Sequence, residues 1–208
     1  MKGPLRALDR TNNEPNARAG ARADLTVRIR RARPGDVDGL ARVHVASWCE
    51  AYAGIIEPEN LERTNMRRSL GRFQGYFWRG GQQRSLLLVA ELDGEIIGYV
   101  NAGVSTRRDL ARGEVYELYV APQHQGRGVG RKLLCAGLWA LATAKRAPAL
   151  IWVLADNHRA RRFYESMRGK LVARAQTRVG EQELAKVAYL WTDYLPWPEH
   201  LVPRKADA

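Results

Sequence analysis

One stretch, Glu114–Arg131, constrains the fold of this chain more than any other. It opens with a β-branched and aromatic run from Val115 to Val120, which is typical of a buried strand. Ala121-Pro122 ends that run, three glycines follow at every second position, and a run with helical spacing starts at Lys132. The pattern predicts a strand, a glycine-rich loop and a helix in direct succession.

The loop between that strand and helix has the character of an anion site. The first turn of a helix presents backbone N–H groups without intrahelical partners, and glycines let a ligand approach them without a Cβ in the way. A pyrophosphate is the anion expected there. Two familiar phosphate loops do not fit: the dinucleotide pattern needs glycine where Arg131 or Leu133 stands, and no P-loop Gly-Lys-Ser/Thr occurs. A tight turn without a ligand is the alternative.

Alternating and helical patterns along the chain predict one α/β (α+β) domain. Asp36 is a candidate N-cap for the first helix, and Asp93-Gly94 is a hairpin turn. Helices do not follow every strand, which favours a mixed, mostly antiparallel sheet of about seven strands flanked by about four helices. Strands are expected at 26–30, 85–91, 95–100, 114–120, 149–154, 170–174 and 184–191, and helices at 37–52, 58–77, 132–145 and 157–167.

Charge divides the chain unevenly. The net charge is +12, and residues 1–33 carry nine Lys/Arg against three acidic residues. We expect residues 1–24 to form a disordered basic arm, 25–197 a single domain, and 198–208 a flexible tail. The arm lacks interleaved aromatic residues, so a solvated tail is favoured over a nucleic-acid contact.

Cysteine, histidine and hydropathy patterns argue against a metal site, an exported protein and a membrane protein. Cys49 and Cys135 lack metal-like or C-x-x-C neighbours, which fits a reducing cytoplasm, and the four histidines form no pair at ligand spacing, so no metal is expected. The first 25 residues hold no apolar signal segment, and the longest nearly apolar run, Leu133–Ala144, is about half of what a membrane span needs. We therefore expect a cytoplasmic protein without a membrane span.

Two segments together resemble one known family. Gln125, Gly128 and Gly130 fill the defining positions of Q/R-x-x-G-x-G/A, the coenzyme A signature of the GNAT N-acetyltransferase superfamily. Downstream, Asn157–Glu165 followed by Gly169 resembles that family's N-x-x-A-x-x-F-Y-E…G segment. The chain therefore resembles a small bacterial-type GNAT member from about residue 27 to 195, departing only around the turn at Gly169.

The resemblance implies that acetyl-CoA is the co-substrate and lies in a split between the 114–120 strand and the strand after it. The main chain of Leu118 and Val120 would pair with the pantetheine. Arg127 and Arg131 add charge near the phosphates, with solvated side chains as the alternative, and Asn157 would bond the cofactor arm, with a plain N-cap as the alternative. The full implied set is Leu118, Tyr119, Val120, Gln125, Gly126, Arg127, Gly128, Val129, Gly130, Arg131, Asn157 and Phe163.

For catalysis, the resemblance singles out Tyr164 as the general acid, with a core aromatic as the alternative. Glu114 and Glu117 are candidates for the base, but they have opposite parity and cannot both face the cleft unless a bulge intervenes. Glu114 is preferred because it shares parity with Val120, which should border the cofactor. A water chain without a dedicated base is equally compatible.

The acceptor and several alternatives stay open. The expected partner is a small-molecule or peptide amine, and Trp48 and Tyr52, one helical turn apart, are candidates for its pocket unless they belong to the core. Other readings are transfer of a bulkier acyl group, a non-catalytic CoA-binding module, or a nucleic-acid-binding protein carried by the basic arm. The sequence does not decide whether the protein is a homodimer.

Overall fold

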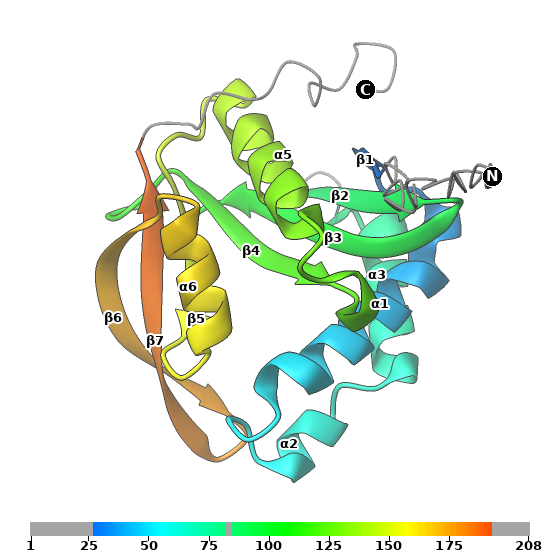
Figure 1. Ribbon diagram of the computed structural model, residues 1–208, viewed down its shortest axis with the longest axis horizontal. Helices are drawn as coiled ribbons and strands as arrows, with labels where there is room; N and C mark the ends of the chain where they lie inside the picture. Colours follow the sequence, from blue (N-terminus) through cyan, green and yellow to red (C-terminus); the bar gives the residue numbers. More distant parts are fainter. Residues whose placement is uncertain (1–26, 82–84, 193–208) are drawn as a thin grey trace, which may run out of the picture.

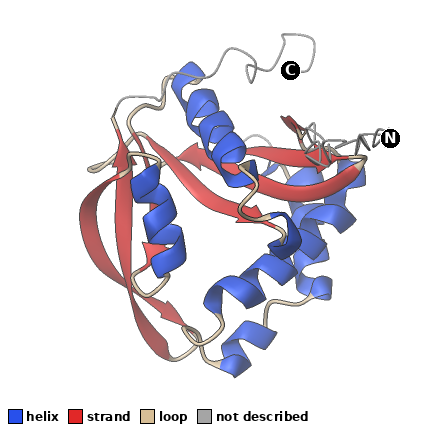
Figure 2. Ribbon diagram, viewed as in Figure 1, coloured by secondary structure: helices blue, strands red, loops and turns tan. Residues whose placement is uncertain are grey.

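The computed structural model describes residues 27–81 and 85–192 (Figure 1). The expected basic arm (1–24) and flexible tail (198–208) therefore lie outside the described residues. The described part confirms the mixed, mostly antiparallel α/β architecture, in which helices cover both faces of one sheet (Figure 2).

Seven strands form this sheet in the order β1-β2-β3-β4-β5-β7-β6. Only β4 and β5 run parallel, because the chain crosses over through a helix between them, as a parallel connection requires. The hairpin expected at Asp93-Gly94 is present. The strand expected at 170–174 continues to Val179, and the strand expected at 184–191 begins at Gln182. The strands are β1 (Arg28–Arg31), β2 (Ser85–Leu92), β3 (Glu95–Val104), β4 (Gly113–Val120), β5 (Ala149–Leu154), β6 (Lys170–Val179) and β7 (Gln182–Trp191).

The described residues hold five α-helices rather than about four, because the segment expected as one helix over 58–77 divides in two. Asn65 interrupts it: its backbone is extended, and its side chain accepts a hydrogen bond from the Arg68 N–H, which caps a new helix. The helices are α1 (Val37–Tyr52), α2 (Pro58–Glu62), α3 (Met66–Trp78), α5 (Val129–Thr143) and α6 (His158–Ser166).

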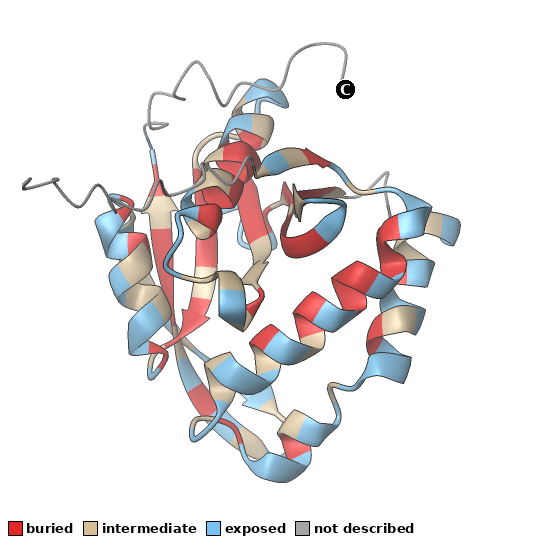
Figure 3. Cartoon of the chain, turned by 45° about the vertical axis from the view of Figure 1, so that its right-hand side comes forward, coloured by how far each residue is buried: buried red, intermediate tan, exposed pale blue. Residues whose placement is uncertain are grey.

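Two apolar layers lie on opposite faces of the sheet. One contains the buried faces of α5 and α6, and the other packs α1 and α3 against β2, β3 and β4. Gly137 lets α5 lie close to the sheet, since a Cβ there would be 3.0 Å from Val100 Cγ2. Figure 3 shows the buried residues of α1 recurring at helical intervals, which agrees with the amphipathic pattern in the sequence.

Asp36 precedes α1 but does not cap it, which corrects the expectation from sequence. Its backbone is already helical and its carboxylate turns to Arg30, with Nη1–Oδ2 and Nη2–Oδ1 distances of 2.7 and 2.8 Å. Arg30 also donates through Nε to Glu91 on β2 at 2.6 Å, and its side chain is only 7% exposed. Burial alone would raise the pKa of Asp36, but the bonds from Arg30 and the Arg33 N–H hold that pKa below its usual range.

Asp36→Asn is expected to lower the free energy of unfolding at neutral pH by about 3 kcal/mol, because it leaves the buried Arg30 charge without its bidentate partner. A carboxyl whose pKa is depressed on folding stabilises the fold above its unfolded pKa, and that contribution is lost as the pH falls below about 4. Urea unfolding of wild type and variant between pH 3 and 7 measures both effects. Equal stability of the two proteins at pH 7 would contradict the expectation.

Candidate functional site

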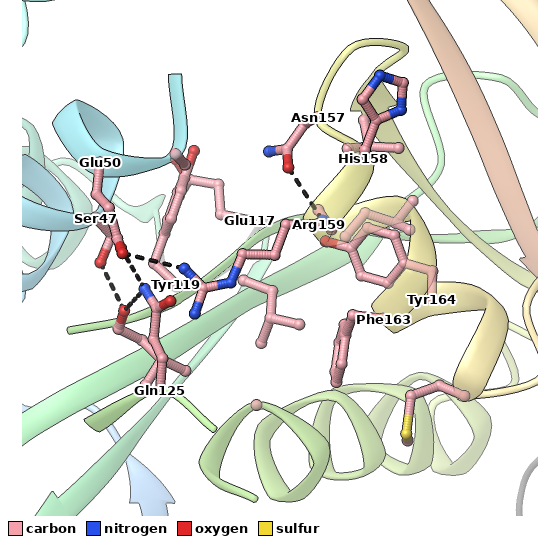
Figure 4. A pocket seen from close by; sticks show the side chains of 18 of the residues that line it. Ser47, Glu50, Glu117, Tyr119, Gln125, Asn157, His158, Arg159, Phe163 and Tyr164 are labelled. Carbon is pink, nitrogen blue, oxygen red and sulfur yellow. Dashed lines mark hydrogen bonds and ion pairs between the residues drawn. The ribbon is translucent and has the colours of Figure 1, made fainter. Parts of the chain in front are cut away.

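A cleft opens where β4 and β5 separate. The two strands pair only from Gly113 to Val115 and from Ala149 to Ile151, although β4 continues to Val120 and β5 to Leu154. The unpaired halves of both strands line a cavity of about 600 Å³, together with the glycine loop, α6 and the C-terminal part of α1 (Figure 4). The split expected between these strands is therefore present.

A β-bulge in β4 changes how Glu114 and Glu117 lie relative to each other. Asn101 of β3 pairs with Glu117 and the next residue, Ala102, pairs with Val115, so one residue of β4 is skipped. The skip resets the alternation: Val115 and Leu118 both pack on the α5 side of the sheet although their numbers differ in parity. Their neighbours Glu114 and Glu117 therefore both point to the face that carries α1 and α3, and position along β4 distinguishes them.

Glu114 was preferred as the base because strict alternation along the strand places it on the same face as Val120. The bulge lies between the two residues and breaks that alternation, so this reason does not hold. Glu114 is buried, and its carboxylate accepts hydrogen bonds from the N–H and the hydroxyl of Thr106, both at 2.8 Å. Glu117, in contrast, is one of the residues that line the cleft. Glu114 thus has a structural environment, whereas Glu117 is in position to meet a ligand.

The glycine loop lies at one end of the cleft. Gly128 has φ +82° and directly precedes α5, a left-handed conformation in which a Cβ is disfavoured. Gly130 lies in the first turn of the helix, and a Cβ there would contact Phe163 Cζ at 3.5 Å and Val120 Cγ2 at 3.9 Å. The N–H groups of this first turn have no carbonyl four residues earlier in the helix, so they are free to receive an anion.

Not every loop residue contributes its side chain. Gln125, Gly126, Gly128, Gly130 and Arg131 line the cleft. Arg127 and Val129 do not line it: the Val129 side chain is buried in the core and Arg127 is exposed to solvent.

Polar side chains from α1, the glycine loop and α6 are hydrogen-bonded together at one edge of the cleft. Ser47 and Gln125 both donate to the carbonyl of Val120, at 3.0 and 2.9 Å. Gln125 also donates to Glu50 Oε2 at 2.6 Å, and Arg159 reaches from α6 across the cleft to Glu50 Oε1 at 3.1 Å (Figure 4). Ser47, Glu50 and Arg159 were not among the site residues expected from the sequence. The i, i+3 spacing of Ser47 and Glu50 on one face of α1 is a signal that could have identified two of them.

The α6 wall carries the other expected side chains. Asn157 caps α6 by accepting from the Ala160 N–H at 3.0 Å, and it also lines the cleft. Phe163 and Tyr164 pack at 5.4 Å between ring centroids and both line the cavity. Tyr164 is only 6% exposed, and burial raises the pKa of its phenol, so the hydroxyl keeps its proton at neutral pH.

Aromatic side chains border the cleft beyond Glu117. Tyr52 and Trp152 line it, from α1 and β5 respectively, together with Ile55. Trp48 packs on Tyr52 at 4.6 Å between ring centroids, behind the cleft surface, and so supports the wall without lining it. Across residues 27–81 and 85–192, no three His, Cys, Asp or Glu side chains gather as a metal site requires, and no helix is long and apolar enough to cross a membrane.

Comparison with known proteins gives consistent matches. The Acetyltransferase (GNAT) family pattern matches residues 47–169. An uncharacterized N-acetyltransferase from Archaeoglobus fulgidus is 36% identical over 66% of this chain and 89% of its own, and a mycothiol acetyltransferase from Nocardioides sp. is 29% identical over 69% of this chain and 49% of its own. The crystal structure of the PaiA N-acetyltransferase from Thermoplasma acidophilum with coenzyme A aligns with a TM-score of 0.59, 20% identity and coverage of 77% and 98%.

Proposed function

Because the chain belongs to the GNAT acetyltransferase family, we propose that it transfers an acetyl group from acetyl-CoA directly to a primary amine in a ternary complex. The observation that carries this proposal is one cleft that is lined by the glycine-rich N-terminus of α5 and also by Glu117 and Tyr164. The first feature suits a pyrophosphate, and the second suits a reaction that moves two protons.

The residues present fit acetyl-CoA. The first turn of α5, from Gly128 to Arg131, would hold the pyrophosphate through its N–H groups, and the side chain of Arg131 would add a positive charge. The open edge of β4 at Leu118 and Val120 offers main-chain groups to the amide-bearing arm. Phe163 closes this channel from the α6 side, beside Gly130.

Two side chains would handle the protons. Glu117 would take a proton from the ammonium of the acceptor, directly or through one water, so that the free amine attacks the thioester carbon. Tyr164 would give its proton to the sulfur as the carbon–sulfur bond breaks, since burial keeps its hydroxyl protonated. Because the two groups come from β4 and α6 and line one cleft, the reacting carbon would lie between them.

The acceptor would be a small amine with an apolar body, because Tyr52, Ile55 and Trp152 line the same cleft as Glu117. The acceptor of the mycothiol acetyltransferase is not proposed for this chain, because the chain spans about half the length of that relative. Transfer of a longer acyl group remains an alternative, since the loop would contact only the coenzyme.

The decisive experiment measures binding before turnover. Acetyl-CoA and CoA are expected to raise the melting temperature, and NADH is not. Release of CoA thiol is then followed with a panel of arylalkylamines, alkylamines, polyamines, amino acids and peptides. Stabilisation by NADH alone, or by none of the three, would refute acetyl-CoA-dependent transfer.

Glu117→Gln is expected to lower kcat by about 10- to 100-fold and to flatten the acidic limb of the pH–rate profile, because the amide cannot accept the ammonium proton. Glu114→Gln, the matched variant on the same strand, should keep that limb, since its carboxylate is occupied by Thr106. Steady-state kinetics between pH 5.5 and 9 compares the two. An acidic limb abolished by the Glu114 variant alone would reverse the assignment.

A further inference from the structure

A chain of polar side chains leads from Glu117 away from the cleft into the protein. Arg72 of α3 pairs with the Glu117 carboxylate through Nη2. Its other terminal nitrogen, Nη1, lies 3.3 Å from His44 Nε2, and His44 Nδ1 lies 3.0 Å from Ser69 Oγ. Arg72 does not line the cleft, so it contacts Glu117 from behind.

The direction of every hydrogen bond in this chain follows from Arg72. A guanidinium has only donors, so His44 Nε2 must accept from it and therefore carries no proton. The ring proton of neutral His44 is then on Nδ1, which donates to Ser69 Oγ. His44 thus holds one arm of the Arg72 fork while the other arm holds Glu117.

His44 is well placed for such a fixed role. It is 7% exposed and packs against the rings of Phe73, Tyr99 and Tyr119 at 5.8–6.5 Å between centroids. Burial, and then the Arg72 charge, lower the pKa of His44 to about 4, so the ring stays neutral at the pH where an amine is acetylated. Among the four linked side chains, Arg72 therefore carries the positive charge and Glu117 carries the negative charge.

We propose that Arg72, held by His44 and Ser69, is a positioning residue that fixes the Glu117 carboxylate toward the acceptor. This inference rests on the proposed acetyl transfer, with Glu117 as the base. The ion pair is partly shielded, since the Arg72 and Glu117 side chains are 39% and 15% exposed. A planar fork with two occupied arms has little rotational freedom, so it orients the carboxylate as well as balancing its charge.

Arg72 is the positive group that faces Glu117 from the described elements around it. The groups that the Glu117 charge influences are His44 and Tyr52 from α1, Arg72 from α3, Tyr99 from β3 and Tyr119 from β4. Burial raises the pKa values of the three tyrosines further above 10, and His44 is neutral above about pH 4. Between pH 5 and 9, therefore, loss of Arg72 removes the cation that pairs with the Glu117 carboxylate.

The first test needs no acceptor. Nitrogen-15 NMR of the imidazole rings, assigned with His44→Gln, is expected to show His44 protonated at Nδ1 and unprotonated at Nε2 throughout pH 5 to 8. Arg72→Leu, which removes the donor, should shift the Nε2 signal, whereas Arg67→Leu on the exposed part of the same helix should not. A His44 ring that titrates near pH 6.5, or one protonated at Nε2, would overturn the proposed chain.

The second test measures catalysis with an amine found in the panel. Arg72→Leu is expected to lower kcat/KM for the acceptor about 10-fold, with unchanged acetyl-CoA affinity. Arg72→Lys should restore only part of the rate, because an ammonium cannot serve both partners as a fork does. An unchanged kcat/KM in Arg72→Leu would refute the positioning role, whereas a wild-type protein without turnover of any amine would refute the proposed function instead.

Discussion

Replacing Gly130 by glutamate is expected to weaken acetyl-CoA binding at least 100-fold, about 2.7 kcal/mol. The Cβ would lie in ordinary contact with Phe163 and Val120, so the fold has room for it, but the rest of the side chain must extend into the cleft between α5 and α6. Its carboxylate would also stand at the helix terminus where the pyrophosphate is expected. Isothermal titration of wild type and variant with acetyl-CoA measures the loss.

Gly71→Glu is the matched control for this substitution. Gly71 is also a helical glycine, in α3, and a Cβ there would meet nothing within 4 Å. Both variants should melt near the wild-type temperature without ligand, and only the Gly71 variant should be stabilised by acetyl-CoA. A full ligand-induced shift in the Gly130 variant would mean that the phosphates bind elsewhere.

The strand, loop and helix around Gly128 could be predicted from sequence because their causes are local. Val115 to Val120 has the composition of a buried strand, Pro122 ends it, and only glycine readily adopts φ +82° before a helix. The N-cap role of Asn157, which was the alternative to a contact with the cofactor, is also local and is observed, while the expected contact with the cofactor remains a prediction.

The orientation of Glu114 and Glu117 could not be predicted in the same way. Strict alternation along β4 would place Glu114 on the same face of the sheet as Val120. Nothing in the local sequence indicates that the pairing with β3 skips one residue of β4 between them. The bulge arises from pairing between two strands, so its position depends on how the sheet closes. Parity alone therefore favours Glu114, whose carboxylate accepts a hydrogen bond from the Thr106 N–H.

Interactions between distant segments were equally out of reach. Asp36 looked like a cap because Pro34-Gly35 precedes it, but Arg30 competes for its carboxylate and makes two bonds where a cap makes one. His44 and Ser69 are 25 residues apart, and Arg72 and Glu117 are 45 apart. Such pairs follow from the packing of α1 and α3 on the sheet, which propensity does not specify.

Tyr164→Phe is expected to lower kcat by about 100- to 1000-fold while acetyl-CoA affinity changes little, because the ring is kept and only the proton donor is lost. Tyr164 lines the cleft and is 6% exposed, so a neutral hydroxyl is available there to a thioester under the proposed function. Because burial raises the pKa of this phenol above 10, wild type should show no alkaline loss of rate from Tyr164 below about pH 10. Single-turnover kinetics at saturating amine isolates the chemical step.

Tyr189→Phe serves as the matched control, since Tyr189 packs on Tyr164 at 5.8 Å between ring centroids yet its hydroxyl bonds Glu165. A tyrosine that serves only the core would lower the melting temperature when changed and leave the chemical step untouched. If Tyr164→Phe turns over at the wild-type rate in the single-turnover experiment, the thiolate must take its proton from water or from the amine itself. The proposed roles of Glu117 and Tyr164 predict the opposite, because removal of either proton carrier then slows the same step.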